Sequence, residues 1–273
     1  MLAIDRPKRV AVVARKGGVG KTTTTVQLAI ALSIIYGINT LVVDNDPQGN
    51  ATARLGVGEG QAPYTLNDVY SWTTAVGQTA GLSAAIHPTT WPGVFVVAGE
   101  EAVKFRETEG EELADYRLQI AYERSDFTSH SIGAILMDTQ PGTGGLLRNA
   151  MIGADAVLVV SDSEPDGLLG AHKALEAAES IKARQNPGLQ ILGVLVNHYD
   201  STMGEHERCV ADLIAAHGER IWLPVVPRRA AVATARGIAR PVQEIRTNGG
   251  RAYVRAMNEH ARRLGRALEL QES

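Results

Sequence analysis

Residues 15–23, with the sequence RKGGVGKTT, combine glycines, lysines and threonines in a pattern that could bind phosphate. Glycine lets the backbone adopt positive φ, so that consecutive N–H groups can approach an anion closely. Lys21 would neutralise the β- and γ-phosphates of a nucleotide, and the Thr22 hydroxyl would be a ligand of Mg²⁺. The pattern predicts a nucleotide site formed by Lys16, Gly17, Gly18, Val19, Gly20, Lys21, Thr22 and Thr23.

The segments on either side of this loop have the character that a phosphate loop requires. An apolar run at 10–14 precedes it, and a helix-like run at 22–36 follows it. A strand, a glycine loop and a helix in this order bring backbone N–H groups and the positive end of the helix dipole to one point. A plain glycine turn would not explain the Lys-Thr pair in this context, so we favour phosphate binding.

Three aspartates follow apolar runs that read as strands. Asp44 and Asp46 come directly after the run that ends at Val43, and Asp138 ends the run 134–137. Carboxylates at the carboxyl ends of parallel strands lie at the ligand-binding edge of an open sheet. There they could hold Mg²⁺ or a water, although DPQGN at 46–50 is also ordinary turn chemistry.

The composition limits the class of protein. The chain has 273 residues, enough for one large α/β domain, and its formal charge of −3 argues against a generally basic DNA-coating protein. Its single cysteine, Cys209, leaves no intramolecular disulfide, which suits a reducing compartment. The sequence shows neither an apolar run long enough for a transmembrane helix nor a signal-peptide pattern.

Charge is unevenly distributed along the chain. Residues 220–273 contain 11 arginines and 4 acidic residues, whereas residues 98–126 contain 9 acidic residues and 4 basic ones. An acidic middle and an arginine-rich end predict a face that binds a polyanion. A charged amphipathic helix in a soluble protein would give the same composition, so both interpretations stay open.

Short apolar runs rich in Val, Ile and Leu alternate with helical patterns, as is typical of parallel strands buried on both faces. Strands are predicted at 9–14, 40–43, 94–98, 133–137, 156–161, 189–196 and 220–223. Helices are predicted at 21–36, 66–70, 166–184, 204–217 and about 250–270, the last with an apolar stripe suited to core packing. We expect a single P-loop NTPase domain over residues 1–273, an α/β fold whose mostly parallel twisted sheet has helices on both faces.

Several motifs together resemble those of the deviant Walker A ATPases, which include the ParA and Soj partition proteins and MinD. The loop reads K-G-G-x-G-K-T-T, with Arg15 where the general pattern has a glycine. Residues 44–52 read D-x-D-P-Q-G-N-x-T, and residues 134–145 resemble the family's aspartate-ended strand and second switch loop. Residues 193–200 and 223–242 resemble later ParA and Soj segments. The resemblance covers about residues 9–268 and is weakest at 56–92.

The resemblance implies roles at the phosphate end of the site. Lys16 would cross a dimer interface to the partner's nucleotide, and Asp46 would orient the attacking water. The expected catalytic residues are therefore Lys16, Lys21 and Asp46. The expected metal residues are Thr22, Asp138 and Asp44. Lys16 could instead be a solvated surface lysine.

The resemblance also implies contacts to adenine and to DNA. Asn197 and Pro227 would border the base, although Asn197 could equally be a turn residue. The candidates for DNA binding are Arg228, Arg229, Arg251 and Arg255.

The family implies a homodimer that sandwiches ATP and Mg²⁺, binds double-stranded DNA non-specifically and hydrolyses ATP slowly until a ParB-like partner accelerates the reaction. The expected result is plasmid or chromosome segregation by a cytoplasmic, nucleoid-associated protein without a membrane partner. A positioner of a non-DNA cargo on the nucleoid would share every motif. A MinD-like membrane-cycling ATPase fits the acidic end of the chain poorly, and a biotin- or cobalamin-pathway synthase fits Lys16 and DPQGN poorly.

Overall fold

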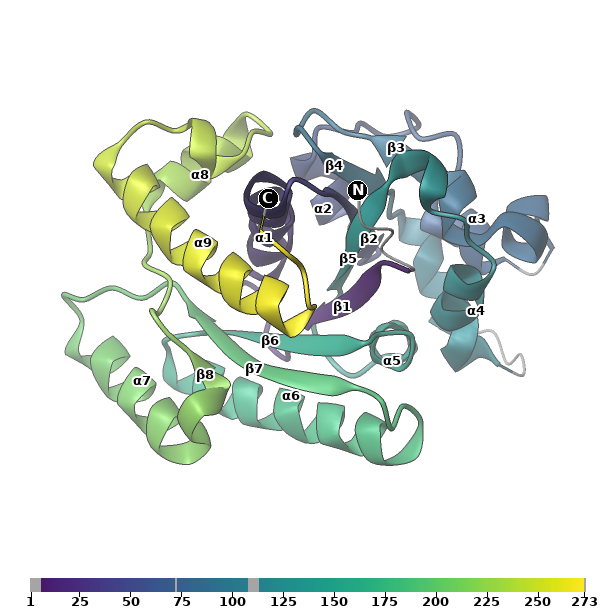
Figure 1. Ribbon diagram of the computed structural model, residues 1–273. Coiled ribbons are helices and arrows are strands. Elements are labelled where there is room, and N and C mark those ends of the chain that lie inside the picture. Colours follow the sequence, from purple (N-terminus) through teal and green to yellow (C-terminus); the bar gives the residue numbers. More distant parts are fainter. Residues whose placement is uncertain (1–5, 72, 108–112, 273) are drawn as a thin grey trace.

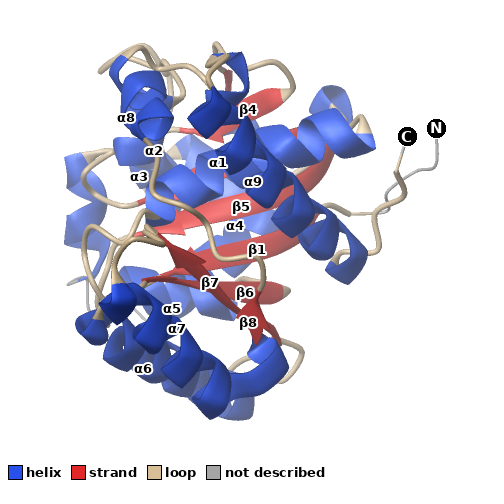
Figure 2. Ribbon diagram, turned by 90° about the vertical axis from the view of Figure 1, so that its left-hand side faces the viewer, coloured by secondary structure: helices blue, strands red, loops and turns tan. Residues whose placement is uncertain are grey.

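The computed structural model describes residues 6–71, 73–107 and 113–272 (Figure 1). Residues 108–112 of the acidic middle segment therefore lie outside the described residues. An eight-stranded sheet runs through the centre, and helices cover both of its faces (Figure 2). This arrangement confirms the predicted α/β class. In the described part of the chain, no helix is both long enough and apolar enough to cross a membrane.

The sheet places the glycine loop at its centre. Its strands are β1 (Lys8–Val13), β2 (Asn39–Asn45), β3 (Ile86–Pro88), β4 (Val94–Val97), β5 (Ile132–Thr139), β6 (Ala156–Asp162), β7 (Gln190–Asn197) and β8 (Ile221–Trp222). Their order is β3-β4-β2-β5-β1-β6-β7-β8, and every pairing is parallel except that of β3 with β4. Because β1 lies between β5 and β6, the loop after it emerges in the middle of the carboxyl edge, where open α/β sheets bind ligands.

Helices pack on both faces of the sheet. They are α1 (Lys21–Tyr36), α2 (Asn50–Arg54), α3 (Leu66–Tyr70), α4 (Arg117–Glu123), α5 (Gly145–Ile152), α6 (Pro165–Arg184), α7 (Gly204–His217), α8 (Ala230–Gly237) and α9 (Asn248–Ala267). Ala11 and Val13 of β1 join one apolar cluster with α3 to α7. Val10 and Val12 join a second cluster with α1, α2, α8 and α9. Alternate side chains of one strand therefore enter two cores, as expected for a buried parallel strand.

Helix α9 packs against α1, which confirms that its apolar stripe is core rather than a free surface (Figure 1). The hydroxyl oxygen of Thr247 accepts a hydrogen bond from the N–H of Gly250 at 3.0 Å and so caps the start of α9. The two helices approach closely, because a Cβ at Gly265 would lie only 2.2 Å from the Tyr36 ring. The end of the chain is thereby fixed to the helix that follows the glycine loop.

Five short elements were not predicted from the sequence: β3, α2, α4, α5 and α8. None exceeds eight residues, which is too short for a repeated apolar pattern, and helices of this length form mainly through tertiary packing. The prediction for β8 was too long: residues 218–220 form a 3₁₀ turn, and Pro224 has no N–H with which to extend the ladder. Helix α3 lies where it was predicted, within residues 56–92, a stretch whose sequence predicted no other element.

Candidate nucleotide site

A cavity of about 910 Å³ opens at the carboxyl edge of the sheet. The whole glycine loop, residues 16–23, lines it, together with residues from the segments that follow β2, β5, β6 and β7. Residues of α8 and α9 form the opposite wall: Val232, Ala233, Arg236 and Tyr253. The structure therefore brings the predicted loop, Asp46, Asn197 and Pro227 to one cavity.

The glycine loop has the backbone geometry that its sequence predicts. Gly18 and Gly20 have φ angles of 83° and 85°, in the left-handed region that favours glycine. A Cβ at Gly20 would lie 2.9 Å from Nδ2 of Asn197, so the loop also needs glycine for space. Immediately after Gly20, α1 begins at Lys21, and its first N–H groups face the loop as an anion site requires.

Asn197 holds the loop from the end of β7. Its Nδ2 donates to the carbonyl oxygen of Val19 at 3.1 Å and to Oγ1 of Thr24 at 2.8 Å. Both N–H bonds of the amide are therefore used within the protein, and a contact with adenine through this donor would have to replace one of them. The predicted adenine contact of Asn197 stays a prediction, and the structure shows a positioning role.

Pro227 lies beside the end of β7. The N–H of Tyr199 donates to Val226 O at 3.0 Å, and the N–H of Arg228 donates to Tyr199 O at 2.8 Å. These bonds continue the β7 pairing beyond the end of the strand and pair Pro227 with Tyr199, and both Pro227 and His198 line the cavity. The two segments predicted to border adenine thus lie together.

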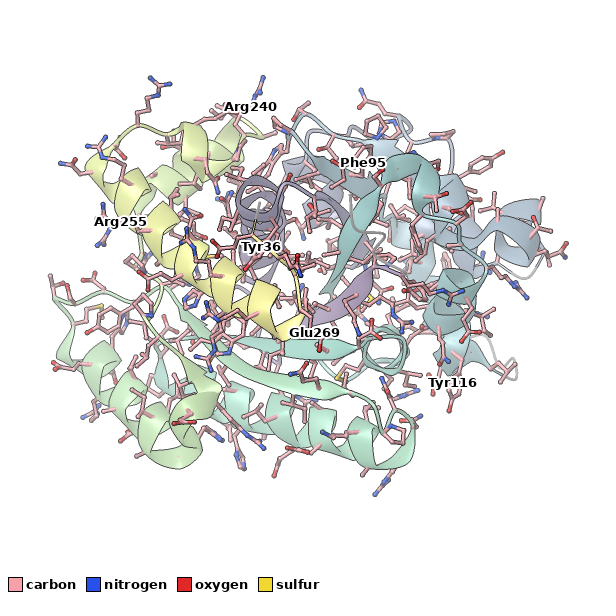
Figure 3. The ribbon with its side chains drawn as sticks, in the orientation of Figure 1. Tyr36, Phe95, Tyr116, Arg240, Arg255 and Glu269 are labelled. Atoms are coloured by element: carbon pink, nitrogen blue, oxygen red, sulfur yellow. The ribbon has the colours of Figure 1, made fainter. Side chains whose placement is uncertain are left out.

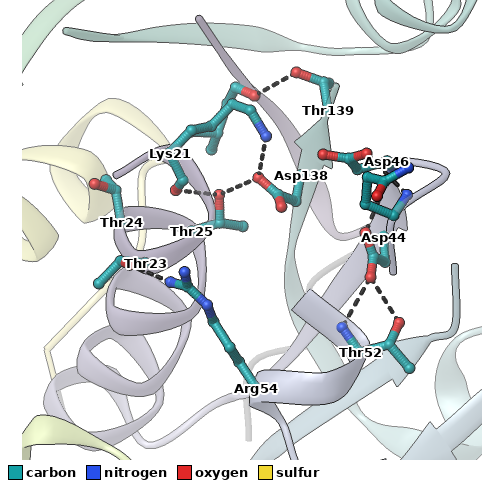
Figure 4. Close-up of polar contacts among 12 residues, drawn as sticks. Lys21, Thr23, Thr24, Thr25, Asp44, Asp46, Thr52, Arg54, Asp138 and Thr139 are labelled. Carbon is teal, nitrogen blue, oxygen red and sulfur yellow. Dashed lines mark hydrogen bonds and ion pairs between the residues drawn. The ribbon is translucent and has the colours of Figure 1, made fainter. Parts of the chain in front are cut away.

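Lys21 is buried and paired with Asp138 (Figure 4). Its Nζ lies 2.7 Å from Oδ1 of Asp138, which also accepts from Oγ1 of Thr25 at 3.2 Å. The other carboxylate oxygen, Oδ2, is buried and has no hydrogen-bond partner. Such an orphaned acceptor beside a phosphate loop fits an ion or an ion-bound water, because buried polar atoms are otherwise satisfied.

The residues at this end of the cavity fit Mg²⁺ held jointly with a nucleotide. Among the described residues, no group of three or more His, Cys, Asp or Glu side chains could hold a metal ion alone. Mg²⁺ usually binds through one or two protein groups together with substrate phosphates and waters. Thr22 lines the cavity, whereas Asp138 is fully buried beside Lys21 and does not line it. Thr22 and the free oxygen of Asp138 would supply those groups.

Asp44 is turned toward α2 instead of the cavity. Its Oδ2 accepts hydrogen bonds from the N–H of Thr52 at 2.8 Å and from its hydroxyl at 2.7 Å. Complete burial, together with the nearby charge of Asp138, raises the pKa of Asp44 to about 7. The structure shows that Asp44 holds α2, and its role as a metal residue stays a prediction.

Asp46, two residues later, does line the cavity. Its Oδ1 accepts a hydrogen bond from the N–H of Gln48 at 3.0 Å, which fixes the carboxylate within the turn. Burial raises the pKa of Asp46 above its ordinary value. A fixed and partly desolvated carboxylate at the wall can orient a water, as the sequence predicts.

Lys16 lies at the rim and is held by carboxylates of its own chain. Its Nζ is 2.8 Å from Oε2 of Glu164 and 3.1 Å from Oδ2 of Asp162. The hydrogen bond that Lys16 donates to Glu164 is the main reason that the pKa of Lys16 is raised. Sequence reasoning missed both partners, although Asp162 ends an apolar strand just as Asp138 does and could have been found by that signal.

The four arginines predicted to bind DNA are exposed but fall into two groups. Arg228 and Arg229 line the nucleotide cavity, whereas Arg251 and Arg255 lie on α9 outside it. Figure 3 shows Arg255 on the outer side of α9. Arg228 and Arg229 therefore lie beside the nucleotide site, and their contact with DNA stays a prediction. Sequence reasoning also missed Arg54, which lines the cavity from α2.

Comparison with known proteins places this site in a family. A family model described as an AAA domain matches residues 7–191. The chromosome partitioning protein ParA of Caulobacter vibrioides is 33% identical over 258 residues, which cover 93% of this chain and 94% of that protein. This chain belongs to the ParA family of P-loop ATPases. The chromosome-partitioning ATPase Soj of Thermus thermophilus is 31% identical over 254 residues, covering 92% of this chain and 94% of that protein.

A solved structure supports the same fold. Cobyrinic acid a,c-diamide synthase from Mycobacterium smegmatis, with bound ADP and magnesium, matches with a TM-score of 0.71 at 26% identity and covers 85% of this chain and 92% of that chain. The architecture is thus common to ParA proteins and a metabolic enzyme. Higher identity over nearly the whole length joins this chain to the ParA family, which confirms the predicted family and the predicted ATPase class.

Proposed function

We propose that this ParA-family chain forms a homodimer with ATP and Mg²⁺ at its interface, binds double-stranded DNA without sequence preference and releases it after hydrolysis. A ParB-like partner accelerates hydrolysis, and the cycle segregates a plasmid or chromosome on the nucleoid. The observation that carries the proposal is the position of Lys16 at the rim of the cavity, where its ammonium group is partly exposed and pairs with carboxylates that lie outside the phosphate loop.

The contacts of Lys16 suggest how ATP controls the dimer. In the structure its ammonium group is shared between Asp162 and Glu164, and 31% of the side chain is exposed. The γ-phosphate of a partner's nucleotide carries more negative charge than either carboxylate. It can therefore attract the flexible Lys16 side chain away from Asp162 and Glu164. An ion pair within one subunit is then exchanged for one between subunits. Two-fold symmetry would provide two such contacts in each dimer.

Within one subunit, the other residues of the site have separate roles in ATP hydrolysis. Lys21 neutralises phosphate charge, and Asp46 orients the water that attacks the γ-phosphate. Thr22 and Asp138 would hold Mg²⁺, which neutralises the charge on the β- and γ-phosphate oxygens when it is bound. Loss of the γ-phosphate removes the attraction on Lys16, which can return to Glu164 and so weaken the dimer.

The arginines at the end of the chain support DNA binding. Arg228, Arg229, Arg251 and Arg255 are exposed, and within the described ranges none of them pairs with a carboxylate. Unpaired surface cations are available to phosphates, and affinity for DNA rises steeply with the number of phosphate contacts. A dimer doubles that number, which explains how ATP could switch DNA binding on.

Retention of DNA by the protein with ATP, with ADP and without nucleotide tests this function. We expect retention only with ATP, and a strong loss of it when Arg251 and Arg255 are both replaced by Glu. The double variant should bind ATP normally, because neither residue lines the cavity. Arg208→Glu, at an exposed arginine of α7, is the matched control and should retain DNA. Equal retention in all nucleotide states, or by the double variant, would contradict the proposal.

A further inference from the structure

Arg54 ends α2 and reaches across to the first turn of α1 (Figure 4). Its Nη1 donates a hydrogen bond to Oγ1 of Thr23, the last residue of the glycine loop. The side chain also lines the nucleotide cavity. No motif recognised in the sequence includes this residue, and the catalytic roles described above do not use it.

The fold fixes the position of Arg54. Helix α2 starts after Gly49, which has a φ of 60°, and Thr52 within it is bound to the buried carboxylate of Asp44. Leu55, directly after Arg54, is fully buried in the core. The backbone on both sides of Arg54 is thus anchored, so its reach toward Thr23 is built into the structure and does not depend on a free loop.

The guanidinium of Arg54 lacks a counter-ion. Among the described residues no carboxylate lies within ion-pair distance, and Thr23 takes one hydrogen bond from a group that has five donors. Burial lowers the pKa of Arg54, since a cation is less favourable away from water. A second cation, Arg236 of α8, lines the same cavity. A partly buried cation without a partner is costly, and an anionic ligand in the cavity would offset that cost.

We infer that Arg54 binds the α-phosphate of the nucleotide. In a phosphate loop, backbone N–H groups cradle the α- and β-phosphates while the lysine reaches the β- and γ-phosphates. Figure 4 shows Lys21 turned toward Asp138, whereas Arg54 meets the first turn of α1 at Thr23, away from that pair. The γ-phosphate belongs at the Lys21–Asp138 side, so the opposite side at Thr23 belongs to the α-phosphate. A planar guanidinium can donate two parallel hydrogen bonds to phosphate oxygens.

This assignment makes a prediction that other roles for Arg54 do not make. The α-phosphate is present in ATP and in ADP, so loss of Arg54 should weaken the binding of both by a similar factor. A residue that contacts the γ-phosphate would weaken the binding of ATP alone. The inference rests on the proposed nucleotide site but is independent of DNA binding and of the dimer.

The experiment is a titration of the full chain with ATP and with ADP in the absence of DNA. Relative to wild type, Arg54→Ala should weaken both affinities about 10- to 100-fold, and Arg54→Lys should weaken them less because it keeps the charge. Arg208→Ala, the exposed arginine of α7, is the matched control and should bind as wild type does. Thermal unfolding of the nucleotide-free variants shows whether each one is folded. If Arg54→Ala does not fold, the affinities of Arg54→Lys are compared with those of wild type instead.

Thr23→Val separates direct contact from support of the loop. If Arg54 contacts phosphate itself, Arg54→Ala should still weaken ADP binding when Thr23 is already Val. If Arg54 acts only through Thr23, the second change should add nothing, which would overturn the inference, as would unchanged ADP affinity in folded Arg54→Ala. If wild-type protein binds nucleotide but not DNA, the proposed partition function is contradicted. The inference that Arg54 binds the α-phosphate would still stand.

Discussion

Asp44 and Asp46 are two residues apart but have different surroundings. Asp44 is fully buried and bound to Thr52, so it positions α2 and, through α2, Arg54. Asp46 lines the cavity with its carboxylate fixed by the N–H of Gln48. The difference shows a scaffolding role for the first aspartate and leaves the second as the candidate that would orient a water.

Replacing Asp46 by Asn tests that assignment. The amide oxygen can still accept the hydrogen bond from Gln48, but the side chain can no longer act as a carboxylate. We expect ATP affinity close to that of wild type and a fall in hydrolysis of roughly 100-fold or more. Steady-state phosphate release measures the rate, with Asp212→Asn on the exposed face of α7 as the matched control. Hydrolysis at the wild-type rate would remove Asp46 from the mechanism.

A short stretch of sequence determines local conformation and residue chemistry, but not the contacts between segments that are distant in the chain. The glycine loop and Asp138 could be predicted because their residue types and neighbours fix both conformation and chemistry. The ion pairs of Lys16 and the reach of Arg54 to Thr23 could not, since they join segments about 30 to 150 residues apart. The hydrogen bonds of Asp44 to Thr52 could not be predicted either, because a position after a strand does not reveal which way a carboxylate turns.

At the scale of elements, α9 joins the chain's end to both α1 and β8. His260 of α9 is fully buried, with its ring 5.7 Å from that of Trp222 in β8. Burial lowers the pKa of His260 to about 4. The apolar stripe of α9 could be predicted from its period, whereas its docking against β8 required the three-dimensional fold.

The buried histidine predicts a pH dependence of stability. Unfolded His260 binds a proton near pH 6.5, but folded His260 does so only near pH 4, so its contribution is complete above about pH 6.5 and is lost as the pH falls toward 4. The loss can reach about 3 kcal/mol. His260→Phe should reduce the decline in the free energy of unfolding over this range, as measured by urea denaturation. His172→Phe, at an exposed histidine of α6, is the control, and an equal decline in all three proteins would contradict the prediction.

At the scale of the whole molecule, topology places the nucleotide cavity near the arginine-rich end of the chain. The central position of β1 puts the glycine loop at the middle of the sheet edge, and the arginine-rich end of the chain returns to the same cavity through Arg228 and Arg229. Nucleotide binding and the cationic face are therefore adjacent. In the proposed function, this proximity would let ATP control DNA binding through a dimer, without a long-range path inside the subunit.

Light scattering of the protein with ATP and with ADP tests the central claim, that Lys16 makes ATP part of a dimer interface. We predict that wild type with ATP has twice the 29.1 kDa mass of one chain and that wild type with ADP is monomeric. Lys16→Ala should remain monomeric with ATP while still binding it, and Lys182→Ala, at an exposed lysine near the far end of α6, should dimerise normally. A normal ATP-dependent dimer of Lys16→Ala would contradict the account.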